Sequence, residues 1–184
     1  LTANFALNEY LLVVTSGTGG SATGDGNFTH GTSASIAATP TTGYHFTNWT
    51  GDGVEDENAA STTVTMDQNR SVTATFAIDQ HVLTLTTGSG GSVSGDGTFD
   101  YGTSASIGAT PDTGYHFDYW TGSGVTSTTE ASTTVTMTAD RNVSAVFAPN
   151  EYTLTLSTGA GGSVTGDGNY TYGASASITA TADS

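Results

Sequence analysis

Histidine is the side chain of this sequence that is best suited to acid–base chemistry near neutral pH. The four histidines are His30, His45, His81 and His116. Catalysis of the hydrolase type needs a histidine held between a nucleophile and a carboxylate, and no motif of the sequence predicts such a group. His30 is matched by Tyr101 and Tyr172 at the same place of a repeated motif, which indicates an amphipathic surface position. We therefore expect no catalytic residue and no enzymatic activity.

Aspartate is the residue type that could hold a metal. One aspartate stands in each of three Gly-Asp-Gly segments, at Asp25, Asp96 and Asp167. Carboxylate oxygens are ligands that Ca²⁺ prefers, but Asp-Gly is also a strong signal for a hairpin turn. We expect hairpin turns and no cofactor, with Ca²⁺ at these three aspartates as the alternative.

A second acidic group comprises Asp52, Glu55, Asp56 and Glu57. Its spacing differs from that of the Asp-x-Asp-x-Asp-Gly calcium loop. The corresponding positions of the next copy are Ser123, Thr126, Ser127 and Thr128. A metal site shared by all copies is therefore excluded at this place.

Three aromatic residues, Trp49, Tyr119 and Trp120, are candidates for stacking on sugar rings. Aromatic side chains also fill small β cores. Strand alternation places Phe46 on one face and Trp49 on the other, unless a β-bulge intervenes. We expect packing in the core or between repeats, with glycan contact as the alternative.

Five asparagines begin an Asn-x-Ser/Thr segment, which is the acceptor pattern for N-glycosylation. These candidate acceptors are Asn27, Asn48, Asn69, Asn142 and Asn169.

Composition excludes several classes of protein. The formal net charge is −15, lysine is absent, and Arg70 and Arg141 are the only arginines. Nucleic-acid binding needs a basic face, so no nucleic-acid partner is expected. The absence of cysteine and lysine excludes disulfides, thioesters and Lys–Asn isopeptide bonds. No segment is apolar enough to predict insertion into a membrane.

The dominant feature is an internal repeat of 71 residues. The Gly-Asp-Gly segments have this spacing, and it also relates Trp49 to Trp120 and Arg70 to Arg141. We divide the chain into the end of a preceding copy, two complete copies and the first half of a third, at residues 1–7, 8–79, 80–150 and 151–184. A permuted unit, with boundaries at 43–113 and 114–184, is the alternative.

Residues of alternating polarity predict an all-β fold with about six short strands in each copy. Ala105 and Ile107 should point inward from one strand, and Val143 and Phe147 from another. In the second copy the expected strands are 82–86, 91–95, 104–110, 115–121, 133–137 and 142–148.

The order of short motifs resembles that of a known family. All three copies contain runs like Tyr152-Thr-Leu-Thr-Leu156, then Gly-Gly-Ser-Val-x-Gly-Asp-Gly and Tyr-Gly-x-Ser-Ala-Ser-Ile. In the two complete copies these are followed by runs like Gly-Tyr-His-Phe-x-x-Trp, Thr-Thr-Val-Thr-Met and Asp-Arg-x-Val-x-Ala-x-Phe. This order is similar to the divergent branch of the internalin-type (InlB-like) B-repeat family. The resemblance implies bacterial proteins that are secreted or attached to the cell surface, a small β-grasp-like fold, and no catalytic residues.

Together these features predict a structural or adhesive repeat of a long extracellular protein, acting as a stalk, a spacer or a fibre-forming segment. Its partners would be neighbouring repeats of the same chain or of identical chains. One alternative is a module that binds a glycan or a host-surface protein through a Tyr/Trp face. Another is a repeat attached to a secreted enzyme.

The junctions between copies are short, which predicts a semi-rigid array. Only four residues, 78–81, separate Ala77 from Val82, and Pro149 restricts φ at the next junction. Small-angle X-ray scattering on chains with two, four and six copies should show a maximum dimension that grows in proportion to copy number. Growth with random-coil scaling would contradict the prediction.

Overall fold

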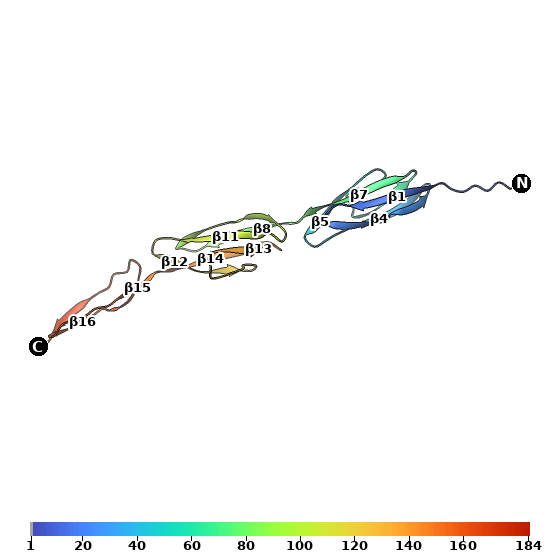
Figure 1. Ribbon diagram of the computed structural model, residues 1–184. Coiled ribbons are helices and arrows are strands. Elements are labelled where there is room, and N and C mark those ends of the chain that lie inside the picture. Colours follow the sequence, from blue (N-terminus) through green and yellow to red (C-terminus); the bar gives the residue numbers. More distant parts are fainter. Residues whose placement is uncertain (1) are drawn as a thin grey trace. The chain divides into compact units, whose positions relative to one another are not determined.

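The protein is described by a computed structural model that covers residues 2–184 (Figure 1). Every regular element in this range is a β-strand, which confirms the all-β prediction. No helix of the described chain has the length and apolarity that crossing a bilayer requires. The chain forms two compact units. Unit 1 ends at Gln80 and also includes Asp100–Gly102, whereas unit 2 comprises His81–Phe99 and Thr103–Ser184.

Seven strands form the first repeat, arranged in two sheets with the orders β3-β1-β7-β5 and β2-β4-β6. The strands are β1 (Glu9–Ser16), β2 (Gly20–Thr23), β3 (Gly26–Thr29), β4 (Thr32–Pro40), β5 (Tyr44–Thr50), β6 (Ser61–Met66) and β7 (Arg70–Ile78).

The first and last strands of the repeat lie side by side. β1 and β7 pair in parallel, from Leu12 opposite Arg70 to Ser16 opposite Ala74, whereas β1–β3, β2–β4, β4–β6 and β5–β7 pair antiparallel. Parallel neighbours require a long connection, and here that connection is most of the repeat. The four-stranded sheet is therefore complete only when the whole 71-residue period is present.

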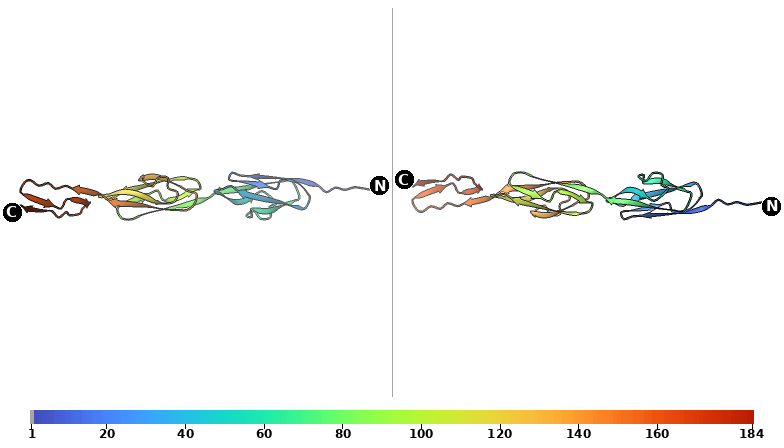
Figure 2. Two further views of the ribbon diagram at one scale, coloured as in Figure 1. Left: turned by 90° about the horizontal axis from the view of Figure 1, so that it is seen from below. Right: turned by 90° about the horizontal axis from the view of Figure 1, so that it is seen from above.

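The second repeat has the same topology, with sheets β10-β8-β14-β12 and β13-β11-β9. Figure 2 shows the strands of this repeat, coloured green to orange, in two further views. Its strands are β8 (Gln80–Thr87), β9 (Gly91–Ser94), β10 (Gly97–Asp100), β11 (Ser104–Pro111), β12 (Tyr115–Gly122), β13 (Ser132–Thr136) and β14 (Arg141–Pro149). Each repeat thus has seven strands, one more than expected. The additional strands, β3 and β10, have four residues each and follow the Gly-Asp-Gly segments.

Residues 151–184 form two two-stranded sheets, β15–β17 and β16–β18. The strands are β15 (Glu151–Leu154), β16 (Gly162–Thr165), β17 (Gly168–Thr171) and β18 (Thr179–Ala182). Counterparts of β5, β6 and β7 are not among these residues, so the apolar face is uncovered. Ile178 is 65% exposed, whereas its counterparts Ile36 and Ile107 are 2% and 4% exposed.

Each complete repeat encloses one apolar core between its two sheets, because strands of both sheets contribute to it. Every buried residue of the first core has the same residue type 71 positions later. The first core contains Leu12, Ala34, Ile36, Ala38, Trp49, Val64, Met66, Val72 and Ala74. Two facing sheets and no helix among residues 2–184 make each repeat a small β-sandwich. The β-grasp-like likeness of this fold stays a prediction.

A β-bulge in the aromatic strand decides the shape of the core. The register of β5 against β7 shifts between Phe46 and Asn48, and that of β12 against β14 between Phe117 and Tyr119. The extra residue turns the following tryptophan to the same side as the phenylalanine. Trp49 is 0% exposed and its ring centroid lies 5.8 Å from that of Phe46.

The phenylalanine that ends each repeat was predicted to be a core residue, and the structure places it at the border of the core. Phe76 and Phe147 pack against the buried clusters but are only partly buried themselves. Phe147 lies 6.1 Å from Phe117, centroid to centroid, with the rings edge to face. The strand phase is therefore correct, while the burial of Phe76 and Phe147 is smaller than a full core position would give.

Unit 2 should consequently lose more stability when Trp120 is truncated than when Phe147 is. Trp120→Ala removes a fully buried ring and should cost about 3–5 kcal/mol of unfolding free energy. Phe147→Ala removes a partly buried ring and should cost roughly 2 kcal/mol. Urea unfolding followed by circular dichroism tests the order, with the unchanged unit 1 as internal reference. A larger loss for Phe147→Ala would show that the bulge does not bury Trp120.

Candidate functional site

The Gly-Asp-Gly segments form corners between the two sheets and are not hairpin turns. In the first repeat the corner joins β2 to β3, and these strands belong to different sheets. Asp25, Asp96 and Asp167 are all exposed. The expected hairpin is therefore wrong: the chain leaves one sheet and enters the other at this point, so the flanking strands do not pair.

A close backbone approach explains the first glycine of each corner. Gly95 has φ +108°, and a Cβ built on it would lie 2.2 Å from the carbonyl oxygen of Ser106. Gly24 meets Ser35 in the same way, at 2.4 Å. Only glycine combines this positive φ with so close a neighbour. The aspartate that follows is exposed, so the close approach explains the first glycine of the motif and not the aspartate.

The acidic groups are dispersed over the surface. Within residues 2–184 no three His, Cys, Asp or Glu side chains lie together as metal ligands would. In the loop between β5 and β6, Glu55 accepts a hydrogen bond from Thr63 Oγ1 at 2.7 Å. Asp56 Oδ1 accepts one from the Asn58 N–H at 2.9 Å. These contacts order the loop, and Ca²⁺ binding at the Gly-Asp-Gly corners stays an untested alternative.

Both arginines hold a loop in place. Arg70 Nε donates to the carbonyl oxygen of Thr65 at 2.8 Å, and its Nη2 lies 2.6 Å from Asp67 Oδ1. Arg141 donates to Ser123 and Thr138 at 2.8 and 2.9 Å. The guanidinium groups are thus bonded to the protein itself rather than presented to an anionic ligand.

The four histidines lie in separate surroundings. His30 packs edge to face on Tyr10, with 5.8 Å between the ring centroids. His81 Nδ1 lies 3.5 Å from Asp140 Oδ1. His45 and His116 lie beside Asp79 and Asn150 at the ends of the two repeats, with Nδ1–Oδ1 distances of 2.7 and 3.0 Å.

Of the three aromatic candidates for glycan contact, the structure leaves one at the surface. Trp49 and Trp120 are 0% and 1% exposed, so neither ring is available for stacking on a sugar. Tyr119 is 41% exposed. Its counterpart in the first repeat is Asn48, so the exposed aromatic is not a feature of every copy.

The indole N–H groups of the two tryptophans point to the following loop. Trp49 Nε1 donates to the carbonyl oxygen of Ala59, and Trp120 Nε1 to that of Glu130, both at 3.0 Å. A buried indole needs such an acceptor. The tryptophans therefore anchor the loops that follow β5 and β12.

The glycosylation sequons differ in accessibility. Asn27, Asn69, Asn142 and Asn169 are exposed, whereas Asn48 is half-buried. Asn48 Oδ1 accepts a hydrogen bond from Thr75 at 2.6 Å, and its Nδ2 donates to the Trp49 carbonyl at 3.1 Å. A glycan on Asn48 would break this pairing, so it is the poorest acceptor of the five.

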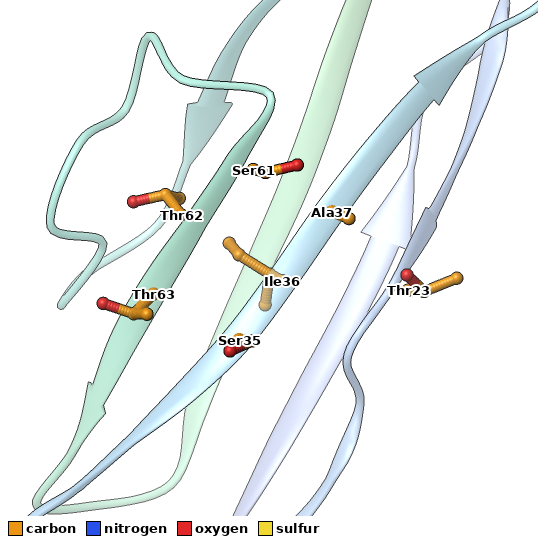
Figure 3. Close-up of a pocket in the computed structure, with 7 residues that line it drawn as sticks. All are labelled: Thr23, Ser35, Ile36, Ala37, Ser61, Thr62 and Thr63. Atoms are coloured by element: carbon orange, nitrogen blue, oxygen red, sulfur yellow. The ribbon is translucent and has the colours of Figure 1, made fainter.

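A shallow hollow lies along the three-stranded sheet of unit 1, beside β2, β4 and β6 (Figure 3). Hydroxyl groups from β4 and β6, including those of Ser35 and Thr63, border it, and no charged side chain lines it. Its open, uncharged surface offers hydrogen bonds but no group for acid–base or metal chemistry.

Sequence reasoning missed one cluster, which lies where each repeat ends. A Cβ built on Gly43 would lie 2.2 Å from the ring of Tyr101, and one on Gly114 would lie 2.1 Å from the ring of Tyr172. The available signal was the repeated Gly-Tyr-His-Phe turn together with the Tyr-Gly pair 58 residues later.

Comparison with known proteins confirms the resemblance that the motifs indicated. The family model described as the divergent InlB B-repeat domain matches residues 10–80, 81–151 and 152–184. No curated protein and no solved structure matches the chain.

The corner analysis predicts opposite outcomes for two adjacent substitutions. Gly95→Ala should destabilise unit 2 by about 2–4 kcal/mol, because left-handed strain adds to the collision with Ser106. Asp96→Ala should change the stability by less than about 0.5 kcal/mol. Thermal unfolding in Ca²⁺ and in chelator measures both. A Ca²⁺-dependent stabilisation that Asp96→Ala abolishes would favour the metal alternative.

Proposed function

Because the chain belongs to the divergent InlB B-repeat family, a family of repeat modules in bacterial surface proteins, we propose that it is a structural segment of a long extracellular protein or fibre. In this role the copies act as a stalk or spacer that holds other parts of the protein away from the surface. The segment is secreted or attached to the cell surface, and it carries no catalytic residue and no cofactor.

One observation carries this proposal: the buried positions are the same in both complete copies, whereas an exposed loop differs between them. All nine buried positions of the first core have the same residue type in the second. The loop 51–60 differs from loop 122–131 at six of ten positions. Gly53 and Val54, which are only partly exposed, keep their type. A spacer needs its core and tolerates change at the surface, whereas a binding face shared by the copies would retain its exposed side chains.

The surface features support the same role. No buried polar or charged side chain occurs among residues 2–184, and the net charge is −15. Acidic surfaces repel one another and keep dense arrays of protein dispersed. The rival glycan-binding function relied on a Tyr/Trp face, and the burial of Trp49 and Trp120 removes most of that face.

Antibodies against the 184-residue chain test the proposed location. Intact cells of the source organism should be labelled at the surface, and treatment with an external protease should remove the label. Labelling that requires permeabilised cells would contradict the proposal. A matched glycan-binding assay with the wild-type chain and Tyr119→Ala should show no difference, since Tyr119 is not part of a shared binding face.

A further inference from the structure

The residue between β7 and β8 connects two turns within unit 1. Asp79 donates its N–H to the carbonyl oxygen of Gly43 at 2.8 Å, and its own carbonyl accepts the N–H of Tyr101 at 2.8 Å. Asp79 Oδ1 also lies 2.7 Å from His45 Nδ1. One residue thus bonds to the turn before β5 and to the turn after β10.

The ring of Tyr101 covers Gly43. Gly43 is buried, has φ +82°, and lies in a turn closed by the Tyr44 N–H and the Thr41 carbonyl at 3.0 Å. A Cβ on Gly43 would lie 2.2 Å from Tyr101 Cδ1, a distance that real Cβ contacts do not show. The ring therefore occupies the space that any other side chain at position 43 would need.

Unit 2 contains the same arrangement 71 residues later. Asn150 donates its N–H to the carbonyl of Gly114 and accepts the Tyr172 N–H, both at 2.8 Å. His116 Nδ1 lies 3.0 Å from Asn150 Oδ1. Gly114 has φ +87°, and its Cβ would meet Tyr172 Cδ1 at 2.1 Å. Two occurrences in separate compact units show that the arrangement belongs to the repeat and not to one local sequence.

In both cases the tyrosine comes from the next copy along the chain. By the repeat boundaries Tyr101 belongs to the second copy, yet Asp100–Gly102 are part of unit 1. Within a repeat, rings already lie on glycines in this manner: Tyr44 covers Gly19 and Tyr115 covers Gly90. A tyrosine ring therefore covers a glycine within each repeat, and a second tyrosine, from the next copy, covers a glycine at the end of the repeat.

We propose that this contact, which we call the Tyr-on-Gly latch, is the interaction surface through which each repeat binds the next repeat along the chain. The latch consists of Gly43, His45, Asp79 and Tyr101 in unit 1, and of Gly114, His116, Asn150 and Tyr172 in unit 2. Its partner is a second copy of the repeat, recognised through an aromatic residue followed by glycine at the turn after its third strand.

The latch makes the stability of one repeat depend on the next, as in a one-dimensional array with nearest-neighbour coupling. The turn after the third strand of a copy is also held by a backbone hydrogen bond where no preceding repeat is bound to it. In the first repeat the His30 N–H donates to the Asn8 carbonyl at 2.8 Å, which matches the Tyr101–Asp79 bond. The ring–glycine contact is then what the junction adds. The inference deepens the proposed function, because it names the partner of each copy, but it does not depend on a surface location.

A pair of glycines with matching backbone conformations allows a controlled test in the full chain. Gly43 and Gly31 have φ +82° and +83°, but nothing lies within 4 Å of a Cβ on Gly31. Gly31→Ala therefore reports the strain alone, and Gly43→Ala reports strain plus collision with Tyr101. Hydrogen exchange read by mass spectrometry follows β5 and β7 of unit 1, with β12 and β14 of unit 2 as reference.

Gly43→Ala should increase exchange in β5 and β7 about tenfold more than Gly31→Ala does. Tyr101→Ala should also increase exchange in β5 and β7, although residue 101 lies in the second copy, whereas Tyr101→Phe should not. Adding Gly43→Ala to Tyr101→Ala should raise exchange only by as much as Gly31→Ala does, because the collision is then absent and only the strain of the positive φ remains. Tyr172→Ala should affect β12 and β14 in the same way.

Equal effects of Gly43→Ala and Gly31→Ala, or additivity with Tyr101→Ala, would overturn the latch. So would a Tyr101→Ala variant in which exchange in β5 and β7 is unchanged. Should Gly43→Ala not fold, the comparison of Tyr101→Ala with Tyr101→Phe decides the question alone. The experiment reads coupling and not location, so its failure and a failure of the surface-labelling experiment are distinguishable.

Discussion

The fold of each repeat depends on burying one tryptophan between two very small sheets. Domains of about 70 residues bury little surface and are marginally stable, so one large ring contributes a considerable part of the core. Trp49 and Trp120 reach the interior only because a β-bulge shifts the register of β5 and β12. Their indole N–H groups then require acceptors, and the carbonyls of Ala59 and Glu130 supply them. The bulge, the buried tryptophan and the loop after each aromatic strand therefore depend on one another.

Glycine residues leave the space that aromatic rings occupy at the ends of the sandwich. Sheets of three or four strands leave the ends of the sandwich open, and the structure closes them with aromatic rings laid on glycine. Phe147 lies on Gly91, where a Cβ would be 2.4 Å from the ring. The Gly-Gly-Ser-Val motif is therefore a packing motif. A larger side chain at Gly91 would displace Phe147 and open the core at its border.

The same device extends from the core to the array. A repeat that is completed by the tip of its successor is stabilised by its position in a series, and a series is what the 71-residue period provides. Such a chain needs neither disulfides nor isopeptide bonds to connect its copies, which agrees with the absence of cysteine and lysine. Its exposed loops are then free to differ, as loops 51–60 and 122–131 do.

The sequence by itself determined the repeat, its family, the all-β class and the inward faces of most strands. These features are local or periodic: alternation marks Ala105 and Ile107 as inward, and both are buried. The tertiary structure decided what depends on partners far apart in the chain. Alternation predicted that Trp49 lies on the other face of the strand from Phe46. Only the pairing of β5 with β7 reveals the β-bulge that turns Trp49 to the same face as Phe46. The Asp-Gly pair indicated a hairpin turn. Only the tertiary structure shows that the strands on either side belong to different sheets, so that the segment is a corner between the sheets. The ring of Tyr101 covers a glycine 58 positions earlier, a contact for which no local pattern exists, because it forms only when both turns are folded.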